Sequence, residues 1–366
     1  MKLNHLSILN YRNIKQAELD FSGKLNCLVG MNGEGKTNLL DAIHYLSLCR
    51  SYSGYLDAMA MTHGEDLMAL QGKYEREDGT PEDIHIGMKR GQKKIVRRGC
   101  KPYRRLSEHI GLIPVVMVSP DDQVLITGGS EERRRFMDLA IAQYDGAYIE
   151  SLARYNKALQ QRNALPKGDE EPDHDLMLMW EEQMNAEADY VFGRRREYVE
   201  RFTPVFQHFH ETISCGREVV RLEYVSHLQR GSLLPQLKEW RSREHAVGYT
   251  LHGIHRDDIE MTLQGHPIRR EGSQGQSKTY LIAMKLAQYD FLHHSGSKTS
   301  PILLLDDIFD KLDSTRVQQI IGLVGGENFG QIFVTDTNRK HLDRILDTCT
   351  GDYRLLQVQG GHIEPC

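Results

Sequence analysis

One short segment of this 366-residue chain has the residue types and spacing of a phosphate-binding loop. Its eight residues, Gly30 to Thr37, fit the pattern G-x-x-x-x-G-K-[ST], with an apolar segment before them and an amphipathic one after them. The glycines allow a tight turn whose backbone N–H groups face the phosphates, and the following helix start adds partial positive charge. A chance glycine-rich turn is disfavoured because strand, loop, Lys-Thr pair and helix occur together.

The side chains of this loop have separate expected tasks in binding ATP and Mg²⁺. Lys36 is expected to reach the β- and γ-phosphates, and the Thr37 hydroxyl is expected to ligate Mg²⁺. The residues expected to bind the cofactor in this segment are Gly30, Met31, Asn32, Gly33, Glu34, Gly35, Lys36, Thr37 and Asn38.

An acidic residue at the end of a neighbouring buried strand must complete the Mg²⁺ shell of such a loop. The apolar run Ile302–Leu305, followed by Asp306 and Asp307, supplies it. We expect Asp306 to hold the metal, usually through a water molecule, and Asp307 to position the attacking water. Asp307 and Lys36 are therefore the expected catalytic residues. A strand that merely ends in an Asp-Asp turn is the alternative, which the presence of the phosphate loop disfavours.

A second glycine-containing loop, Gly272–Lys278, precedes a predicted helix and offers the Ser273 hydroxyl. A helix start with exposed backbone N–H groups is an anion-binding site. One chain has no obvious use for two γ-phosphate sites, whereas two chains arranged head to tail do. An ordinary turn that caps a helix is the alternative. The 270 residues between Lys36 and Asp306 also disfavour a compact P-loop kinase or a small GTPase.

The hydrophobic pattern predicts the elements that must position these loops. Helices are expected at 36–48, 131–165, 176–214 and 276–292, and strands at 3–9, 25–29, 67–98 (several, antiparallel), 113–118, 219–224, 259–263, 302–305, 331–335 and 353–358. We therefore expect an α/β protein in three segments. Residues 1–130 form the N-terminal part of an ATPase lobe, residues 131–240 a helical insertion lobe, and residues 241–366 the C-terminal part of the ATPase lobe.

A basic segment at residues 89–105 contains nine Lys or Arg among 17 residues and no acidic residue. On a hairpin it would concentrate positive charge, and we expect it to contact DNA phosphates. The residues expected to do so are Lys93, Lys94, Arg97 and Arg98. A solvated hairpin whose lysines guard a sheet edge is the alternative. The triplet Arg194–Arg196 is more typical of the wet face of a helix.

The composition is that of a protein without membrane spans or disulfides. Hydrophobic residues make up 39% of the chain, and no run approaches about 18 apolar residues. The six cysteines are scattered, which favours reduced thiols and a cytoplasmic location. His252 and His255 have H-x-x-H spacing but no obvious third ligand, so zinc is disfavoured.

Seven motifs in this order resemble ABC-type ATPase heads, and within them the SMC-like DNA-repair ATPases of the RecF family. They are Asn10-Tyr11-Arg12-Asn13, the phosphate loop with Asn38-Leu39-Leu40, Ser119-Pro120-Asp121-Asp122, Glu132–Asp138, His255-Arg256-Asp257-Asp258, Ser273-Gln274-Gly275-Gln276 and Leu304-Leu305-Asp306-Asp307. The resemblance implies an ABC-type head with an antiparallel subdomain and a helical lobe. It also implies an ATP-dependent homodimer in which Ser273 and Gln276 belong to the nucleotide site and Ser273 meets the γ-phosphate of the other subunit. Arg12 is implied as a phosphate contact.

The same resemblance implies DNA binding at junctions of single and double strands, weak ATP hydrolysis, and no membrane. It implies RecO- and RecR-like partners that help RecA load at gaps during repair, replication restart and the SOS response. Asp307 stands where ABC-type heads usually have Glu, and Phe333–Asn338 lacks the usual switch histidine, so slow turnover is expected. The alternative is a head that regulates a separate effector, such as an OLD-like nuclease or a transporter subunit.

Overall fold

The computed structural model describes residues 1–366 except 166–172, 295–298, 311, 327, 338 and 349–351. The chain forms two compact units. Unit 1 comprises residues 1–123, 208–218 and 273–366, and unit 2 comprises residues 124–207 and 219–272. Unit 2 is thus formed by two segments of the chain, which residues 208–218 separate.

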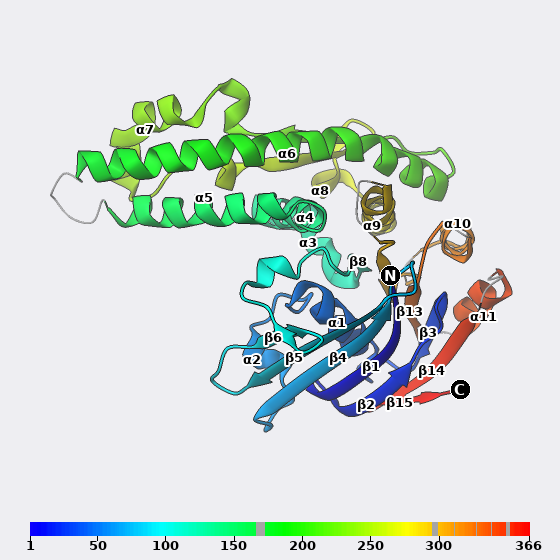
Figure 1. The fold of residues 1–366 in the computed structure, drawn as a ribbon. Helices are drawn as coiled ribbons and strands as arrows, with labels where there is room; N and C mark the ends of the chain where they lie inside the picture. Colours follow the sequence, from blue (N-terminus) through cyan, green and yellow to red (C-terminus); the bar gives the residue numbers. More distant parts are fainter. Residues whose placement is uncertain (166–172, 295–298, 311, 327, 338, 349–351) are drawn as a thin grey trace. The chain divides into compact units, whose positions relative to one another are not determined.

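An antiparallel sheet forms the first part of unit 1 (Figure 1). Its strand order is β2-β1-β4-β5-β6-β7, comprising Ile14–Asp20, Lys2–Tyr11, Leu67–Glu75, Pro81–Lys89, Ile95–Arg98 and Lys101–Pro102. Buried and accessible residues alternate along β4 and β5. Since successive side chains of a strand point to opposite faces, one face of this sheet belongs to the core and the other faces outward.

A second sheet of unit 1 is parallel except at one edge. Its order is β15-β14-β3-β13-β12-β8, comprising His362–Pro365, Tyr353–Gln359, Leu25–Val29, Ile332–Asp336, Ile302–Asp306 and Val115–Val118. The strands β12, β13 and β8 are buried along their whole length, as expected for parallel strands covered on both faces. The carboxyl ends of β3, β12 and β13 lie at one edge of this sheet.

Helix α1, Lys36–Leu48, contacts strands of both sheets. The sequence predicted its bounds, but it also predicted an amphipathic helix, and that part is wrong. All but two of its thirteen residues are buried, because sheets cover it on two sides. The helices α9, Gln274–His294, α10, Ser314–Gly325, and α11, Arg339–Thr348, complete the main helices of unit 1 with the short α2, Asp57–Ala60.

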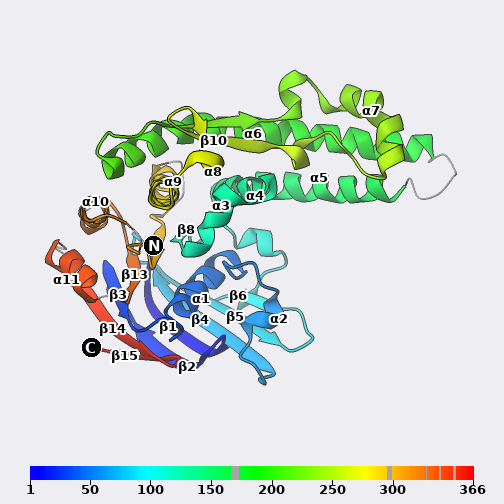
Figure 2. The ribbon, with the colours of Figure 1, turned by 180° about the vertical axis from the view of Figure 1, so that it is seen from behind.

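Unit 2 is built on helix α5, Gly146–Ala164, and on residues 174–207 of helix α6, His174–Ser214, and these two helices run side by side (Figures 1 and 2). Ion pairs between Arg154 and Glu187 and between Arg162 and Glu181 join them. Its other helices are α3, Val124–Thr127, α4, Ser130–Ala142, α7, Leu233–Val247, and α8, Ile268–Glu271, and its small sheet contains β9, Val220–Val225, β10, Asp258–Leu263, and β11, His266–Pro267.

Arg195 on α6 corrects the expectation of a wet helix face. Its side chain is 2% exposed, and its guanidinium donates to Asp138 at 2.9 Å and to Asp257 at 2.7 Å. A charged side chain is this deeply buried only when it is paired and hydrogen-bonded. The Asp257 partner comes from the motif His255–Asp258, so this motif organises the interior of unit 2.

In the part of the chain that the structure describes, no helix combines the length and the apolar character needed to span a bilayer.

Candidate nucleotide-binding site

The phosphate loop joins β3 to α1, and its glycines are required by its geometry. Gly33 and Gly35 have φ of 84° and 112°, which side chains rarely adopt. A Cβ on Gly35 would lie 2.7 Å from Oδ1 of Asn13, and a Cβ on Gly30 would lie 2.3 Å from the carbonyl oxygen of Val358. The loop is therefore packed against backbone and side chains that have no room for larger residues.

Lys36 is folded back over the loop. Its ammonium donates to the carbonyl oxygens of Gly30 at 2.7 Å and of Met31 at 2.9 Å. Burial lowers the pKa of Lys36, and the nearby carboxylates of Asp307 and Asp306 oppose that shift. The ammonium thus lies inside the loop, where an anionic ligand held by the backbone N–H groups would meet it.

Thr37 and Asp306 bring two oxygen ligands together at the carboxyl edge of the parallel sheet. The Thr37 hydroxyl donates to Oδ2 of Asp306 at 2.8 Å, and the Thr335 hydroxyl donates to Oδ1 at 2.7 Å. Burial raises the pKa of Asp306, and these two hydrogen bonds oppose the shift. Mg²⁺ prefers carboxylate, hydroxyl and water oxygens in this kind of setting. The pair fits the expected metal site, with Thr37 as ligand and Asp306 beside it.

Asp307 lies next to Asp306 in a left-handed backbone conformation with φ of 47°. Its N–H donates to the Thr335 hydroxyl at 3.1 Å, and the ammonium of Lys278 donates to its carbonyl oxygen at 3.2 Å. A non-glycine residue in this region costs energy and is retained where the surroundings fix it. Burial raises the pKa of the Asp307 carboxyl.

These side chains line one pocket of about 220 Å³. Its lining comprises Asn32, Gly33, Gly35, Lys36, Thr37, Asn38, Pro120, Asp306 and Asp307. The structure therefore brings together the phosphate loop and the Asp-Asp pair, which are 270 residues apart. It also adds Pro120, whose motif the sequence singled out only through the resemblance.

The turn between β14 and β15 braces the loop from the other side, a contact that was not predicted from the sequence. The Gly361 N–H donates to the carbonyl oxygen of Glu34 at 2.8 Å, and the Gly360 N–H donates to the Glu34 carboxylate. Asn13 joins the same cluster, since its amide donates to the Glu34 carbonyl at 3.1 Å and accepts from Asn38 at 2.8 Å.

Arg12 lies in a second hollow of about 1090 Å³, which Thr37 and Asn38 also line. Its guanidinium donates to the Ser51 hydroxyl and to the Met59 carbonyl oxygen, both at 3.0 Å. It also lies 3.6 Å from the Asp41 carboxylate. Arg12 is thus beside the phosphate loop, but in this state it is bonded to residues 41–59.

Ser273 and Gln276 form a reciprocal cap at the start of α9. The Ser273 hydroxyl accepts from the Gln276 N–H at 3.2 Å, and the Gln276 side chain accepts from the Ser273 N–H at 2.9 Å. Ser273 is exposed, whereas the Gln276 amide also donates to Glu218 at 3.1 Å. Neither is among the described residues that line the phosphate pocket of the same chain.

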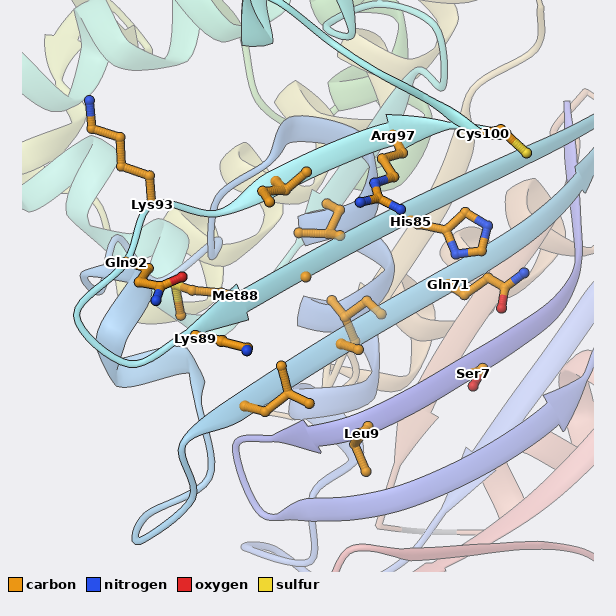
Figure 3. A pocket seen from close by; sticks show the side chains of 17 residues that line it. Ser7, Leu9, Gln71, His85, Met88, Lys89, Gln92, Lys93, Arg97 and Cys100 are labelled. Carbon is orange, nitrogen blue, oxygen red and sulfur yellow. The ribbon is translucent and has the colours of Figure 1, made fainter.

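The basic hairpin is divided by the sheet. Lys94 donates to the Cys49 carbonyl oxygen and pairs with Asp57 at 2.8 Å, and Arg98 pairs with Glu82. Lys93 and Arg97 instead point outward beside a hollow on the outer sheet face (Figure 3). Of the four residues expected to contact DNA, Lys93 and Arg97 have no carboxylate partner among the interactions that the structure describes.

His255, half of the H-x-x-H pair, contacts the Tyr155 hydroxyl through Nδ1 at 2.8 Å. Burial lowers its pKa to about 4. Within the described ranges, no group of three or more His, Cys, Asp or Glu side chains could hold a metal ion.

Known proteins resemble this chain along nearly its whole length. The family model for an AAA ATPase domain matches residues 1–97. A "DNA replication and repair protein RecF" from Bacteroides fragilis is 55% identical over 363 residues, covering 99% of this chain and 98% of the relative. Its namesake from Porphyromonas gingivalis is 49% identical over 364 residues, covering 99% and 100%.

Solved structures extend the comparison to the fold. One described as "recombination mediator protein RecF-ATP in RecFOR pathway" is 27% identical with a TM-score of 0.89, covering 100% of this chain and 97% of that chain. An Smc head domain from Pyrococcus furiosus is 16% identical with a TM-score of 0.60, covering 100% and 96%, which shows a shared fold alone. These matches confirm the predicted α/β ATPase-head fold, and the chain belongs to the RecF family.

Proposed function

We propose that this chain is an ATP-binding protein of recombinational DNA repair and replication restart that acts as an ATP-driven, head-to-tail dimer. Its relatives are named for DNA replication and repair, and a solved relative is described with ATP in the RecFOR pathway. Binding of DNA at junctions of single and double strands, RecO- and RecR-like partners, and a cytoplasmic location belong to the same proposal.

The exposed helix cap at Ser273 is the main observation that supports the proposed dimer. The helix α9 is 21 residues long, and its first turn presents the positive end of its dipole with an exposed hydroxyl. Ser273 is not among the described residues that line the phosphate pocket of its own chain. A second copy would bring its Ser273 to the γ-phosphate, with Gln276 holding the cap in place.

The proposed chemistry of the pocket follows from its side chains. Lys36 would hold the β- and γ-phosphates, and Thr37 with Asp306 would hold Mg²⁺, which would neutralise phosphate charge. Asp307 would orient the attacking water. Its carboxylate is one methylene shorter than the glutamate of related heads, so hydrolysis would be slow and ATP would serve as a clamp between subunits.

Light scattering with a non-hydrolysable ATP analogue and Mg²⁺ tests the dimer. Ser273→Asp retains a good helix cap, since Asp is among the preferred N-cap residues, but places a carboxylate against the γ-phosphate. Ser273→Asn is the matched neutral variant that also caps helices. We expect the Asp variant to stay monomeric at analogue concentrations that dimerise the wild type and the Asn variant. Equal dimerisation of both variants would contradict the proposal.

Arg12 is proposed to release residues 41–59 and contact phosphate when ATP binds. This contact would replace hydrogen bonds to Ser51 and Met59 that are present now. The hairpin presents fewer unpaired cations to DNA than its sequence suggested. With Lys94 and Arg98 paired to carboxylates, two of the four expected residues, Lys93 and Arg97, remain for phosphates, fewer than the roughly 6–10 contacts that give strongly salt-dependent DNA binding.

A further inference from the structure

The outer face of the antiparallel sheet contains a trough that strand register explains. Leu9, Ala69, Gly87 and Ile95 are direct cross-strand neighbours on β1, β4, β5 and β6. The two central positions have the smallest side chains, whereas the two ends have large aliphatic ones. The result is a hollow of about 790 Å³, open to solvent, whose floor is the middle of this row. Figure 3 labels Leu9 at one end of the row.

The rim of the trough exposes large aliphatic side chains, whereas the solvated face of a sheet is usually polar. Leu9 is 36% exposed, Leu67 is 41% exposed and Ile95 is 52% exposed. A Cβ built on Gly87 would have no heavy atom within 4 Å, so the space above the floor is empty of protein. A contiguous exposed apolar patch with a polar rim is typical of an interaction site, whereas isolated exposed residues are not.

The charged side chains of the trough are all cationic. Lys89, Lys93 and Arg97 line it, and no Asp or Glu is among its described lining residues. Within the described interactions, these three make no ion pair. Three other cations of the same hairpin do: Arg90 pairs with Asp66, Lys94 with Asp57 and Arg98 with Glu82. Three cations of the hairpin are thus neutralised by carboxylates, whereas the three that line the trough have no described ion pair.

We propose that this trough docks a segment of a partner protein in which large aliphatic or aromatic side chains adjoin Asp or Glu. The apolar side chains would cover Ala69 and Gly87, and the carboxylates would meet Lys89, Lys93 and Arg97. The row from Leu9 to Ile95 crosses three strand spacings, roughly 14 Å at about 4.8 Å each. That distance matches about four residues of extended chain at roughly 3.3 Å per residue.

DNA fits this surface less well than an acidic, apolar protein segment does. Three cations over an apolar floor would leave most phosphates without a partner. Single-stranded DNA is usually held by bases stacked on aromatic rings, and no Phe, Tyr or Trp is among the described residues that line the trough. The proposal does not depend on ATP-driven dimerisation, because the trough shares no lining residue with the phosphate pocket.

The test uses a phage-displayed library of random 12-residue peptides selected on the full-length protein. Gly87→Glu is the blocking variant, since the backbone there is ordinary strand and the added side chain enters empty space while lowering the local positive charge. Lys73→Glu is the control, because it also introduces a carboxylate on the sheet but on β4 outside the trough, and it changes the net charge even more than Gly87→Glu does. Unchanged thermal unfolding of both variants shows that the fold is intact.

We expect the selected peptides to combine aliphatic or aromatic residues with Asp or Glu. Their Kd should rise at least tenfold on Gly87→Glu and less than twofold on Lys73→Glu. Failure to recover such peptides, or equal binding to both variants, overturns the proposal. The same variants are titrated with gapped DNA. A tenfold loss of DNA affinity confined to Gly87→Glu would assign the trough to nucleic acid and also overturn it.

Discussion

Replacing Gly361 by alanine should weaken ATP binding although this residue lies about 325 positions from the phosphate loop. Gly361 has φ of 82°, and a Cβ there would lie 2.3 Å from the carbonyl oxygen of Asn13. Relief of that overlap must move Asn13 away from Glu34, with which it shares a hydrogen bond. Two hydrogen bonds at the loop, from Gly361 and from Asn13 to the Glu34 carbonyl, would then be lost or stretched.

Each such bond contributes about 0.5–1.5 kcal/mol net, so two contribute about 1–3 kcal/mol. If that free energy positions the loop for ATP, the Kd for ATP should rise roughly 5- to 150-fold, since about 1.4 kcal/mol is tenfold. Calorimetric titration of MgATP into the monomeric protein measures this directly. Thermal unfolding should also report a loss of stability, because alanine in a left-handed conformation costs about 1–2 kcal/mol.

Gly360→Ala is the matched control for the Gly361 substitution. Gly360 has φ of 56°, so alanine pays the same backbone cost, but its Cβ would meet only the Glu34 carboxylate at 4.0 Å. Both variants should therefore lose stability, and only Gly361→Ala should lose ATP affinity by the factor given. Equal ATP affinities in the two variants would refute the idea that the C-terminal hairpin braces the loop.

Three further changes test other parts of the structure. Arg195→Met should destabilise unit 2 by about 3–5 kcal/mol in denaturant unfolding, because it leaves Asp138 and Asp257 without their buried partner; a loss below 1 kcal/mol would contradict this. Burial lowers the pKa of His44 to about 4, so the contribution of His44 to stability is full above pH 6.5 and falls by about 3 kcal/mol as pH drops to 4. His44→Gln should flatten that slope in unfolding midpoints measured from pH 7 to 4, and an unchanged slope counts against His44 as its source. Asp307→Glu should raise steady-state ATPase activity, since a better-placed base contributes up to roughly 10²–10⁴-fold; a fall in turnover with ATP affinity intact would show that the longer side chain misplaces the water.

The phosphate loop could be predicted from sequence because its determinants are local. The glycines, the Lys-Thr pair and the strand and helix around them lie within about twenty residues, and the structure places helix α1 at the predicted residues, Lys36–Leu48. The pairing of this loop with Asp306 was predictable for another reason. The carboxyl ends of parallel strands share one edge of a sheet. A buried apolar run that ends in Asp-Asp is typical of a central parallel strand, so its two carboxylates are expected at the same edge as the phosphate loop.

Other features depend on neighbours that are remote in sequence and carry no local sign. Helix α1 has Asp41, His44 and Ser47 among its buried residues because sheets cover it on two sides, and such cover has no periodic signature. Arg195 belongs to a triplet of arginines whose sequence is typical of a solvated helix face. Its buried partners, Asp138 and Asp257, come from segments 57 and 62 residues away. The brace at Gly361 likewise joins the end of the chain to its beginning.

The division of the hairpin's cations between the two faces of the sheet, in contrast, could have been predicted from the sequence. Side chains of a strand alternate between faces, so Arg97 and Arg98 on β6 lie on opposite sides, and Lys93 and Lys94, just before this strand, divide in the same way. The structure follows this parity: the even-numbered pair meets the carboxylates of Asp57 and Glu82, and the odd-numbered pair faces the open trough. A count of nine basic residues treats the segment as one positive surface, whereas parity splits it into a structural half and a half available for binding. Parity also selects the better experiment, since substitution of all four residues would remove internal ion pairs together with the exposed cations and would confound folding with recognition.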